Sequence, residues 1–297
     1  MTIKPRRQSP LLYIFLAMAM LYLLVFIGLP VLYTLVMSVQ DVSLSNISDL
    51  MRPFVGLDNY RAALQDPSFQ RTLINSAIFV GVNVVAQVGL GLMAAMFFAQ
   101  DFPGAYFMRG LLLSSWILPA LVVGALWKWI FATEYGVANF FLSRLHVIGS
   151  SIHWLSDPAF ALSAVTIANV WFGTPFAMIL IAAGLVSIAE EQYEAASLDG
   201  AGPLARVWYI TLPSLWPTLV AVACLVTIYT MRAFDLIFAM TQGGPLDASN
   251  VLPLLSYQIS FQQFHFGIGA AIGSFSFIIV VGVAALYVRT LRREAEA

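Results

Sequence analysis

Charged residues are scarce in this sequence, and their scarcity excludes most soluble folds. They make up 10% of the 297 residues, whereas hydrophobic residues make up 60%. A soluble domain carries roughly a quarter charged residues, so this chain lacks the polar surface that contact with water requires. One transmembrane helix needs about 20 apolar residues to cross a bilayer core of roughly 30 Å. Composition and length therefore predict an all-α, polytopic membrane protein with about six transmembrane helices.

Cysteine and lysine are also nearly absent. The single cysteine, Cys224, lies within an apolar run, which excludes an internal disulfide and a cysteine-cluster metal site. The lysines are Lys4 and Lys128, and neither belongs to a Gly-x-x-x-x-Gly-Lys-Ser/Thr loop, which cradles nucleotide phosphates. We therefore expect that the chain binds no ATP, and that any ATP-driven process takes its energy from a separate subunit.

Patterns that indicate catalysis are missing as well. The histidines, His146, His153 and His265, have no partner at metal-ligand spacing. The sequence contains neither a Gly-x-Ser-x-Gly nucleophile motif nor a carboxylate pair within an apolar run. The net charge of −1 gives no indication of a nucleic-acid partner. We therefore predict no catalytic residue, no metal site and no cofactor on this chain, and we expect that it is not an enzyme.

The sequence does contain a series of long apolar runs. They cover residues 11–39, 72–99, 110–131, 159–187, 214–238 and 266–289. The first run follows Lys4, Arg6 and Arg7, as the apolar part of a secretory signal would, but it is longer than the usual 7–15 residues or so. We therefore expect an uncleaved first span, in which neighbouring helices compensate for the interruption at Gly28 and Pro30.

Basic residues near the chain ends predict the orientation. They are Lys4, Arg6, Arg7, Arg289, Arg292 and Arg293. Because Lys and Arg accumulate on the cytoplasmic side, both ends are predicted to be cytoplasmic, in agreement with an even number of spans. The predicted organisation is a cytoplasmic tail at 1–10, a transmembrane domain at 11–289 and a second tail at 290–297. The loop 188–213 then lies inside the cell.

This loop is acidic, and its sequence predicts two short helices around a tight turn. Good helix formers run from Glu190 to Leu198, with acidic residues in the first turn, where the helix dipole favours them. Gly200 is suited to the left-handed conformation that ends a helix. Pro203 suits the first position of the second helix. Prolines 213 and 217 are predicted to begin the next span.

The same loop resembles the signature of the permease subunits of ABC importers. It contains Glu194-Ala195-Ala196, then three residues and Gly200, and then nine residues and Ile210-Thr211-Leu212-Pro213. The resemblance implies the type I importer architecture and a helix-turn-helix that docks in a cleft of a cytoplasmic ATPase. The residues that it implies for docking are Glu190, Glu191, Glu194, Ala195, Ala196, Asp199, Gly200 and Ala201. The other interpretation is a simple acidic connector, although connectors between helices usually have only about 2–8 residues.

The resemblance extends along most of the chain and is closest to the sugar permeases, which include the maltose and glycerol-phosphate importers. It is carried further by the segments Val55–Tyr60, Trp154–Pro158 and Thr241–Pro245. It implies a second homologous permease, two ABC ATPase subunits that hold ATP and Mg, and a periplasmic or extracellular solute-binding protein. It also implies a location in a bacterial or archaeal inner or plasma membrane, with lipid around the spans.

A solute site is implied by the same resemblance. Residues 169–175 resemble the Asn-x-Trp-x-Gly-x-Pro segment of the maltose permease. The implied contacts are Asn169, Phe172, Gly173, Tyr229 and Thr230, and Arg232 is a further candidate contact on the same span. Asn169 either contacts solute or joins two helices, and polar side chains within a membrane are candidates for both roles. Asn83 and Gln87 are predicted to form interhelical hydrogen bonds.

Arg232 departs from the maltose permease, which has an Asn-rich stretch at this point. Its planar guanidinium would suit a phosphate or sulfonate group on the solute. The alternative is an ion pair with Asp235, three residues further along. The predicted function is translocation of a sugar or sugar-derived solute by alternating access, with an anionic group left open. A secondary transporter of a small polar solute is the alternative, and it would need coupling carboxylates within the spans.

Overall fold

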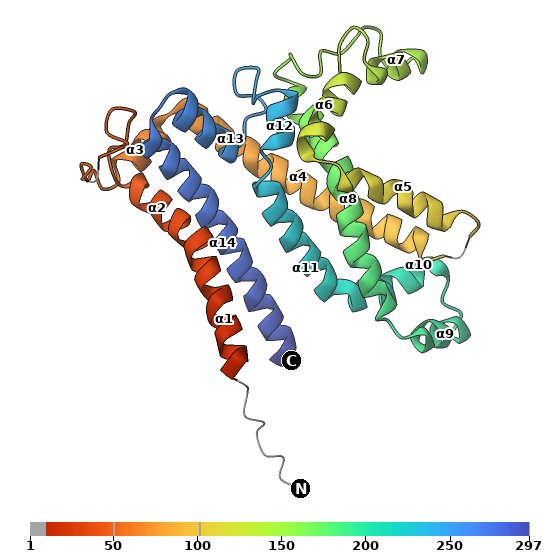
Figure 1. The fold of residues 1–297 in the computed structure, drawn as a ribbon. Coiled ribbons are helices and arrows are strands. Elements are labelled where there is room, and N and C mark those ends of the chain that lie inside the picture. The colour runs from red at the N-terminus through yellow and green to blue at the C-terminus, as the bar shows by residue number, and fades with distance from the viewer. Residues whose placement is uncertain (1–9, 50, 101, 297) are drawn as a thin grey trace. The chain divides into compact units, whose positions relative to one another are not determined.

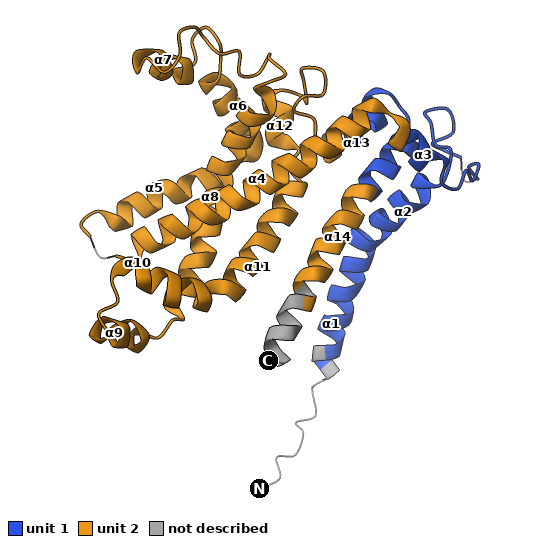
Figure 2. Ribbon diagram, turned by 180° about the vertical axis from the view of Figure 1, so that it is seen from behind, with its two compact units in different colours: residues 1–63, 256–274 blue, residues 64–255, 275–297 orange. Residues whose placement is uncertain are grey.

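The computed structural model describes residues 10–49, 51–100 and 102–296. The elements in these ranges are helices, apart from two isolated β-bridges, Gln40–Phe54 and Ser43–His265 (Figure 1). The chain divides into two compact units (Figure 2). Unit 1 comprises Met1–Ala63 and Ser256–Ser274, and unit 2 comprises Leu64–Leu255 and Phe275–Ala297. The predicted N-terminal tail lies almost entirely outside the described residues.

Unit 1 contains the first membrane span. Helix α1 (Pro10–Leu23), the π-helical turn η1 (Leu24–Gly28) and α2 (Leu29–Ser38) follow one another directly. The interruption expected at Gly28 and Pro30 is therefore a single π-turn, and the apolar helix Tyr13–Ser38 is long enough to span a membrane. At its end, the Asn59 side chain donates hydrogen bonds to the carbonyl oxygens of Ser38 and Gln40, at 3.0 and 2.8 Å. Asn59 belongs to the short helix α3 (Asp58–Gln65).

The other elements follow in chain order. They are α4 (Pro67–Phe98), α5 (Ala105–Ile117), α6 (Ala120–Ile130), α7 (Val137–Arg144), α8 (Ala161–Val186), α9 (Glu190–Leu198), α10 (Pro203–Arg206), η2 (Val207–Thr211), α11 (Leu212–Met231), α12 (Asp235–Met240), α13 (Leu252–Tyr257), η3 (Gln258–Gln262) and α14 (Phe266–Glu296). Helix α4 starts earlier than the apolar run, because Asp66 accepts a hydrogen bond from the Ser68 backbone N–H at 2.8 Å and Pro67 occupies the first turn.

The span predicted at 110–131 is broken. Helices α5 and α6 meet at a bend of 103°, at Leu118 and Pro119. Pro119 disfavours helical geometry in the residue before it, and Leu118 is accordingly extended, with ψ of 143°. The described residues therefore contain five helices able to span a membrane, or six if this bent pair is one span. The predicted fold class is confirmed.

The boundaries predicted for the fifth span were wrong. The helix does not begin at Pro213 or Pro217 but continues from Pro203 to Met231. The π-helical turn η2 precedes Pro213, which occupies the first turn of α11, and only Pro217 lies inside that helix. Within the continuous helix a proline removes one backbone hydrogen bond and crowds the preceding turn, and the wider π-turn lies at that place. At the other end the helix stops at Met231, seven residues before the predicted end, and α12 follows as a separate helix.

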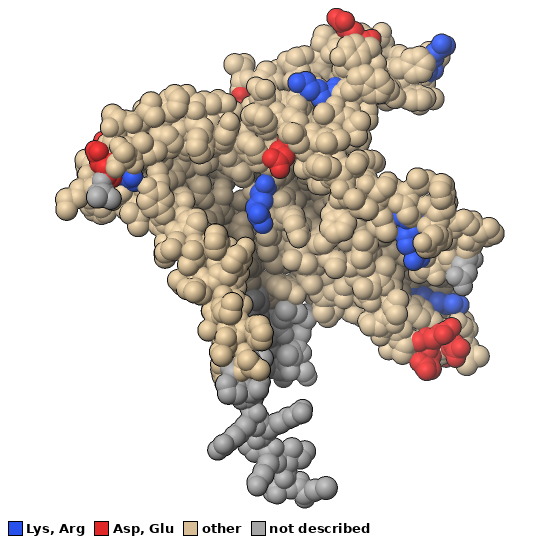
Figure 3. Space-filling view, in the orientation of Figure 1, with Lys and Arg blue, Asp and Glu red and all other residues tan. Residues whose placement is uncertain are grey.

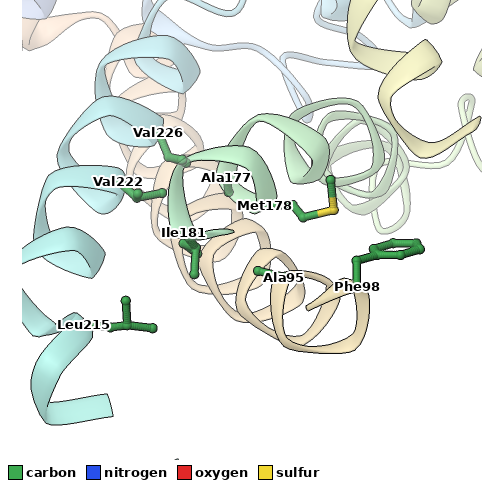
Figure 4. Packing of buried hydrophobic residues seen from close by; sticks show 8 residues of the cluster. All are labelled: Ala95, Phe98, Ala177, Met178, Ile181, Leu215, Val222 and Val226. Atoms are coloured by element: carbon green, nitrogen blue, oxygen red, sulfur yellow. The ribbon is translucent and has the colours of Figure 1, made fainter. Parts of the chain in front are cut away.

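The core of unit 2 lies where α4, α8 and α11 pack together. Figure 4 shows the buried side chains at this crossing, which are Ala95, Phe98, Ala177, Met178, Ile181, Leu215, Val222 and Val226. The contact is close because small residues face each other: a Cβ on Gly91 would lie 2.8 Å from the Cβ of Ala177. Close backbone approach through small residues is typical of membrane helices. This packing fixes the part of α4 that carries Gln87 against α8.

Candidate functional site

A cavity of about 270 Å³ lies in unit 2 beside the packed helices. All of the predicted solute contacts line it, namely Asn169, Phe172, Gly173, Tyr229, Thr230 and Arg232. They come from α8, from α11 and from the residue that ends α11. Sequence reasoning missed several other lining residues, among them Trp116, Phe176 and Asp235, and it assigned Gln87 only to helix packing. The structure thus brings the predicted residues together around one space.

The floor of the cavity is formed by the amide side chains of Gln87 in α4 and Asn169 in α8, and the buried amide of Asn83 in α4 is hydrogen-bonded to both. The Asn169 side chain donates from Nδ2 to Oδ1 of Asn83 at 2.7 Å. Gln87 donates from Nε2 to the same Asn83 oxygen at 2.9 Å and to the backbone carbonyl of Asn169 at 3.1 Å. The interhelical hydrogen bonds predicted for Asn83 and Gln87 are therefore present. Asn169 forms such a bond and also lines the cavity, so the two roles considered for it are compatible.

Gly173 has a steric role at this floor. A Cβ at this position would overlap the carboxamide of Gln87, with Oε1 as the nearest atom. Only a residue without a side chain lets Gln87 lie flat against α8 and reach the Asn169 carbonyl. Gly173 therefore lines the cavity and also leaves room for the Gln87 carboxamide, which forms part of the cavity floor.

Aromatic side chains form one wall. The rings of Trp116 and Phe176 stack with centroids 5.4 Å apart, and Phe176 meets Tyr229 edge-to-face at 5.1 Å. Trp116 comes from α5, next to the bend, so the broken span places an aromatic ring in the wall. Such surfaces suit a flat, partly apolar ligand, and the polar groups beside them orient it.

Arg232 and Asp235 bring opposite charges to the cavity. Arg232 ends α11 and Asp235 begins α12, and both side chains are exposed. The prediction placed Arg232 within a span, whereas the structure places it at a helix end, because α11 stops at Met231. The two side chains do not form an ion pair, which would require a distance of 4.0 Å or less. Among the described residues, an ion pair is found between Arg61 and Asp58, at 3.1 Å. Arg232 therefore lines the cavity without an ion-paired carboxylate among those residues.

The loop 188–213 forms the predicted helix-turn-helix. Helix α9 covers Glu190–Leu198 as expected, and Pro203 is in the first turn of α10. Gly200 has φ of +80°, the left-handed conformation predicted for it. The hydroxyls of Tyr193 and Thr211 lie 3.0 Å apart, and Arg206 donates from Nε to the Ala201 carbonyl at 2.9 Å. These bonds join both arms of the turn into one rigid element.

The surface of this element is acidic and apolar at once. The carboxylates of Glu190, Glu191, Glu194 and Asp199 are exposed, and Figure 3 shows acidic side chains gathered over α9. Leu198 is 90% exposed, Tyr209 83% and Leu204 77%. The sequence analysis did not single out these apolar residues, although apolar side chains in a polar loop are a usable signal. Exposed apolar groups rimmed by charge indicate an interaction surface.

Comparison with known proteins identifies the family. Residues 87–294 match the model of the binding-protein-dependent transport system inner membrane components. The chain belongs to this family. The matched residues include the helix-turn-helix and all of the residues that line the cavity.

Several relatives of this permease are named as sugar transport permeases. It is 35% identical to the trehalose/maltose transport system permease protein MalF of Thermococcus litoralis, over 96% of this chain and 95% of the relative. It is also 35% identical to the sulfoquinovosyl glycerol transport system permease protein SmoG of Agrobacterium fabrum, over 84% of this chain and 80% of the relative. Its fold is similar to that of a bacterial ABC transporter involved in the import of alginate, with a TM-score of 0.81, 20% identity and 95% of each chain covered.

The resemblance to carbohydrate-type ABC permeases is therefore confirmed. The chain is a pore-forming permease subunit of an ABC importer, a transport component and a multi-pass membrane protein of the inner-membrane permease family. The candidate spans contain no Asp or Glu, which is unfavourable for the alternative of a secondary transporter with coupling carboxylates.

Proposed function

We propose that this permease translocates a sugar or sugar-derived solute through the cavity between α4, α8 and α11. The observation that carries the proposal is the composition of the lining, in which amide oxygens, a hydroxyl and aromatic rings surround one space. Aromatic rings pack on the apolar faces of a sugar, while the amides and Thr230 exchange hydrogen bonds with its hydroxyls. The sugar permeases at 35% identity support the same solute class.

The chain works with other subunits in this proposal. A second homologous permease completes the pore, two ABC ATPases bind ATP and Mg, and an external solute-binding protein delivers the solute. A solved relative in complex with a pentasaccharide-bound periplasmic protein supports this type of assembly. The chain itself has no ATPase site, because the phosphate-binding loop is absent from its sequence.

The loop 188–213 is the proposed docking element for the ATPase. The docking residues are Glu190, Glu191, Glu194, Ala195, Ala196, Asp199, Gly200 and Ala201, in the exposed turn already described. Carboxylates of α9 pair with basic residues of the partner, and Leu198 adds apolar contact. The loop is cytoplasmic in this proposal, and so are both termini, with the transmembrane domain at 11–289 and tails at 1–10 and 290–297.

A solute with an anionic group is a second candidate within the same class. It is favoured by Arg232, whose guanidinium lines the cavity and has no carboxylate within 4.0 Å among the described residues. A guanidinium binds phosphate or sulfonate through two parallel hydrogen bonds.

The test is an uptake panel. The permease is reconstituted in proteoliposomes with its partner permease, ATPases and binding protein. Maltose, trehalose, sulfoquinovosyl glycerol and glycerol phosphate are supplied outside in separate experiments, and amino acids and metal ions are supplied in parallel. Uptake of at least one glycoside is the expected result. Uptake of amino acids or metal ions instead, with every glycoside excluded, would contradict the proposal.

A further inference from the structure

Asn83 is a polar residue in the middle of α4 that the proposed function leaves without a role. Its side chain is fully buried, with 0% of its surface exposed, and it does not line the cavity. It donates from Nδ2 to the Phe79 carbonyl of its own helix at 2.7 Å. This bond fixes which end of the Asn83 amide faces α8. Its Oδ1 therefore points between the helices.

The fixed oxygen of Asn83 orients two residues of the cavity floor. It accepts from Nδ2 of Asn169 at 2.7 Å and from Nε2 of Gln87 at 2.9 Å. Both N–H bonds of the Gln87 amide are used, because the second one goes to the Asn169 carbonyl at 3.1 Å. An amide has a donor end and an acceptor end, and here its nitrogen end is held inside the protein.

The oxygen ends of these amides remain available. Neither Oδ1 of Asn169 nor Oε1 of Gln87 accepts a hydrogen bond from another described residue. Among the described residues, the side-chain atoms that are both fully buried and without a hydrogen bond do not include these two oxygens. Both residues line the cavity. The amide atoms of these two residues that are left without a partner are therefore oxygens, so a solute group that hydrogen-bonds to them must be a donor.

We infer that Asn83 is a positioning residue that sets the polarity of the cavity floor and thereby selects solutes that present hydroxyl groups to it. Asn83 does not touch the solute. It holds Asn169 and Gln87 so that their oxygens meet sugar hydroxyls, whereas an ether oxygen, a carbonyl or a fluorine at the same place meets another acceptor. The inference rests on the proposed function, because it needs a sugar in this cavity.

The probes that test it are sugars that differ by one donor. Fluorine replaces a hydroxyl with little change in size but cannot donate a hydrogen bond. The sugar of the panel that the importer takes up is compared with each of its monofluoro derivatives, and uptake is measured for wild type and variants at matched membrane expression. The readout is the ratio of kcat/KM for the sugar to that for the derivative, which cancels effects on the amount of active importer.

The variants separate positioning from folding. Asn83→Leu and Asn83→Ala both remove the acceptor, so that Asn169 and Gln87 can turn their N–H groups to the solute. Asn83→Asp keeps oxygens that accept from both amides. Asn75→Leu is the matched control, because Asn75 lies on the same helix and is buried, but donates to the Asp247 carbonyl at 2.8 Å and does not line the cavity.

Wild type should prefer hydroxyl over fluorine by about tenfold or more at one or two ring positions, as sites that bond a hydroxyl do. At least one of Asn83→Leu and Asn83→Ala is expected to assemble, and in that variant the preference for hydroxyl should fall to about twofold or less. Asn83→Asp and Asn75→Leu should keep the wild-type preference. If the Asn83 variants lose rate but keep the wild-type preference, or if wild type has no preference at any position, the inference is overturned while sugar transport stands. If wild type takes up no sugar of the panel, the proposed function itself fails.

Discussion

The hydroxyl of Tyr193 in α9 lies 3.0 Å from the hydroxyl of Thr211, which ends the π-turn before α11. Through this bond, the exposed acidic helix is attached to the same continuous helix, Pro203–Met231, that carries Tyr229 and Thr230 into the cavity. In the proposed coupling, a movement imposed on α9 would reach the cavity wall through this bond and this helix.

Tyr193→Phe should weaken coupling without preventing assembly. One hydrogen bond contributes about 1 kcal/mol, so the ratio of sugar imported to ATP hydrolysed should fall about two- to fivefold. Thr211→Val removes the same bond and also the bond that the Thr211 hydroxyl donates to the Arg206 carbonyl at 3.3 Å, so its effect should be at least as large. The double variant should be no worse than Thr211→Val alone, because that change already removes the bond to Tyr193. Additive losses would show that the two hydroxyls act independently.

Gly200 is expected to tolerate only residues that accept a left-handed backbone. Its φ is +80°, and no atom lies within 4 Å of an added Cβ, so strain rather than space limits the residue. Gly200→Val should cost about 1–2 kcal/mol of turn stability and reduce uptake strongly, whereas Gly200→Asn should retain most of it. Gly202→Ala is the matched control, since Gly202 has φ of −69° and equally open space. Wild-type uptake by Gly200→Val would contradict the coupling role of this turn.

Gly173→Ala should impair transport by displacing Gln87. The added methyl group would overlap the Gln87 carboxamide, which must then leave the Asn169 carbonyl. We expect a fall in sugar uptake of about tenfold, since the cavity floor loses its geometry. Gly89→Ala on α4 is the control, because nothing lies within 4 Å of its added Cβ. The account of the floor is wrong if both alanine variants transport at the same rate.

Arg232 should report whether the solute is anionic. With sulfoquinovosyl glycerol as the solute, Arg232→Ala should raise KM about tenfold or more, and Arg232→Lys should restore it poorly because the paired hydrogen bonds are lost. With a neutral disaccharide, neither change should have a large effect.

A control addresses the charge pair with Asp235. If these residues pair in another state of the transport cycle, the double variant Arg232→Ala, Asp235→Asn should recover what Arg232→Ala loses. That recovery would contradict the anion site and leave a neutral sugar as the solute. Uptake is measured for single and double variants at matched expression.

The helices and the turn were predicted from local signals in the sequence, whereas the cavity residues on α8 and α11 were predicted from the resemblance to the sugar permeases. Gly200 and Pro203 indicated the turn on their own, and Asn169 and Gly173 both lie in the apolar run 159–187 that predicted a span. The bend at Pro119 was missed because the apolar run continues through it, and periodicity alone does not reveal a 103° break. The end of α11 at Met231 was missed because residues 232–238 are also mostly apolar.

The arrangement of the cavity floor could not be predicted from the sequence, because it depends on contacts between helices. Asn83 and Gln87 are four residues apart, which suggests one helix face, but nothing local indicates that both amides turn toward Asn169. That geometry depends on the close packing of Gly91 against Ala177 and on the missing side chain at Gly173. Trp116 and Phe176 likewise meet only because the broken span places α5 against α8.

The central claim is that this chain is the pore of an ATP-driven sugar importer, and the energy source of uptake tests it most directly. Proteoliposomes that contain the permease pair and its ATPases are supplied with the labelled panel sugar and the binding protein outside. The account predicts accumulation only when ATP and Mg are available to the ATPases and the binding protein is present, with no response to a sodium or proton gradient. Accumulation driven by an ion gradient in vesicles that contain the permease without ATPases would contradict it.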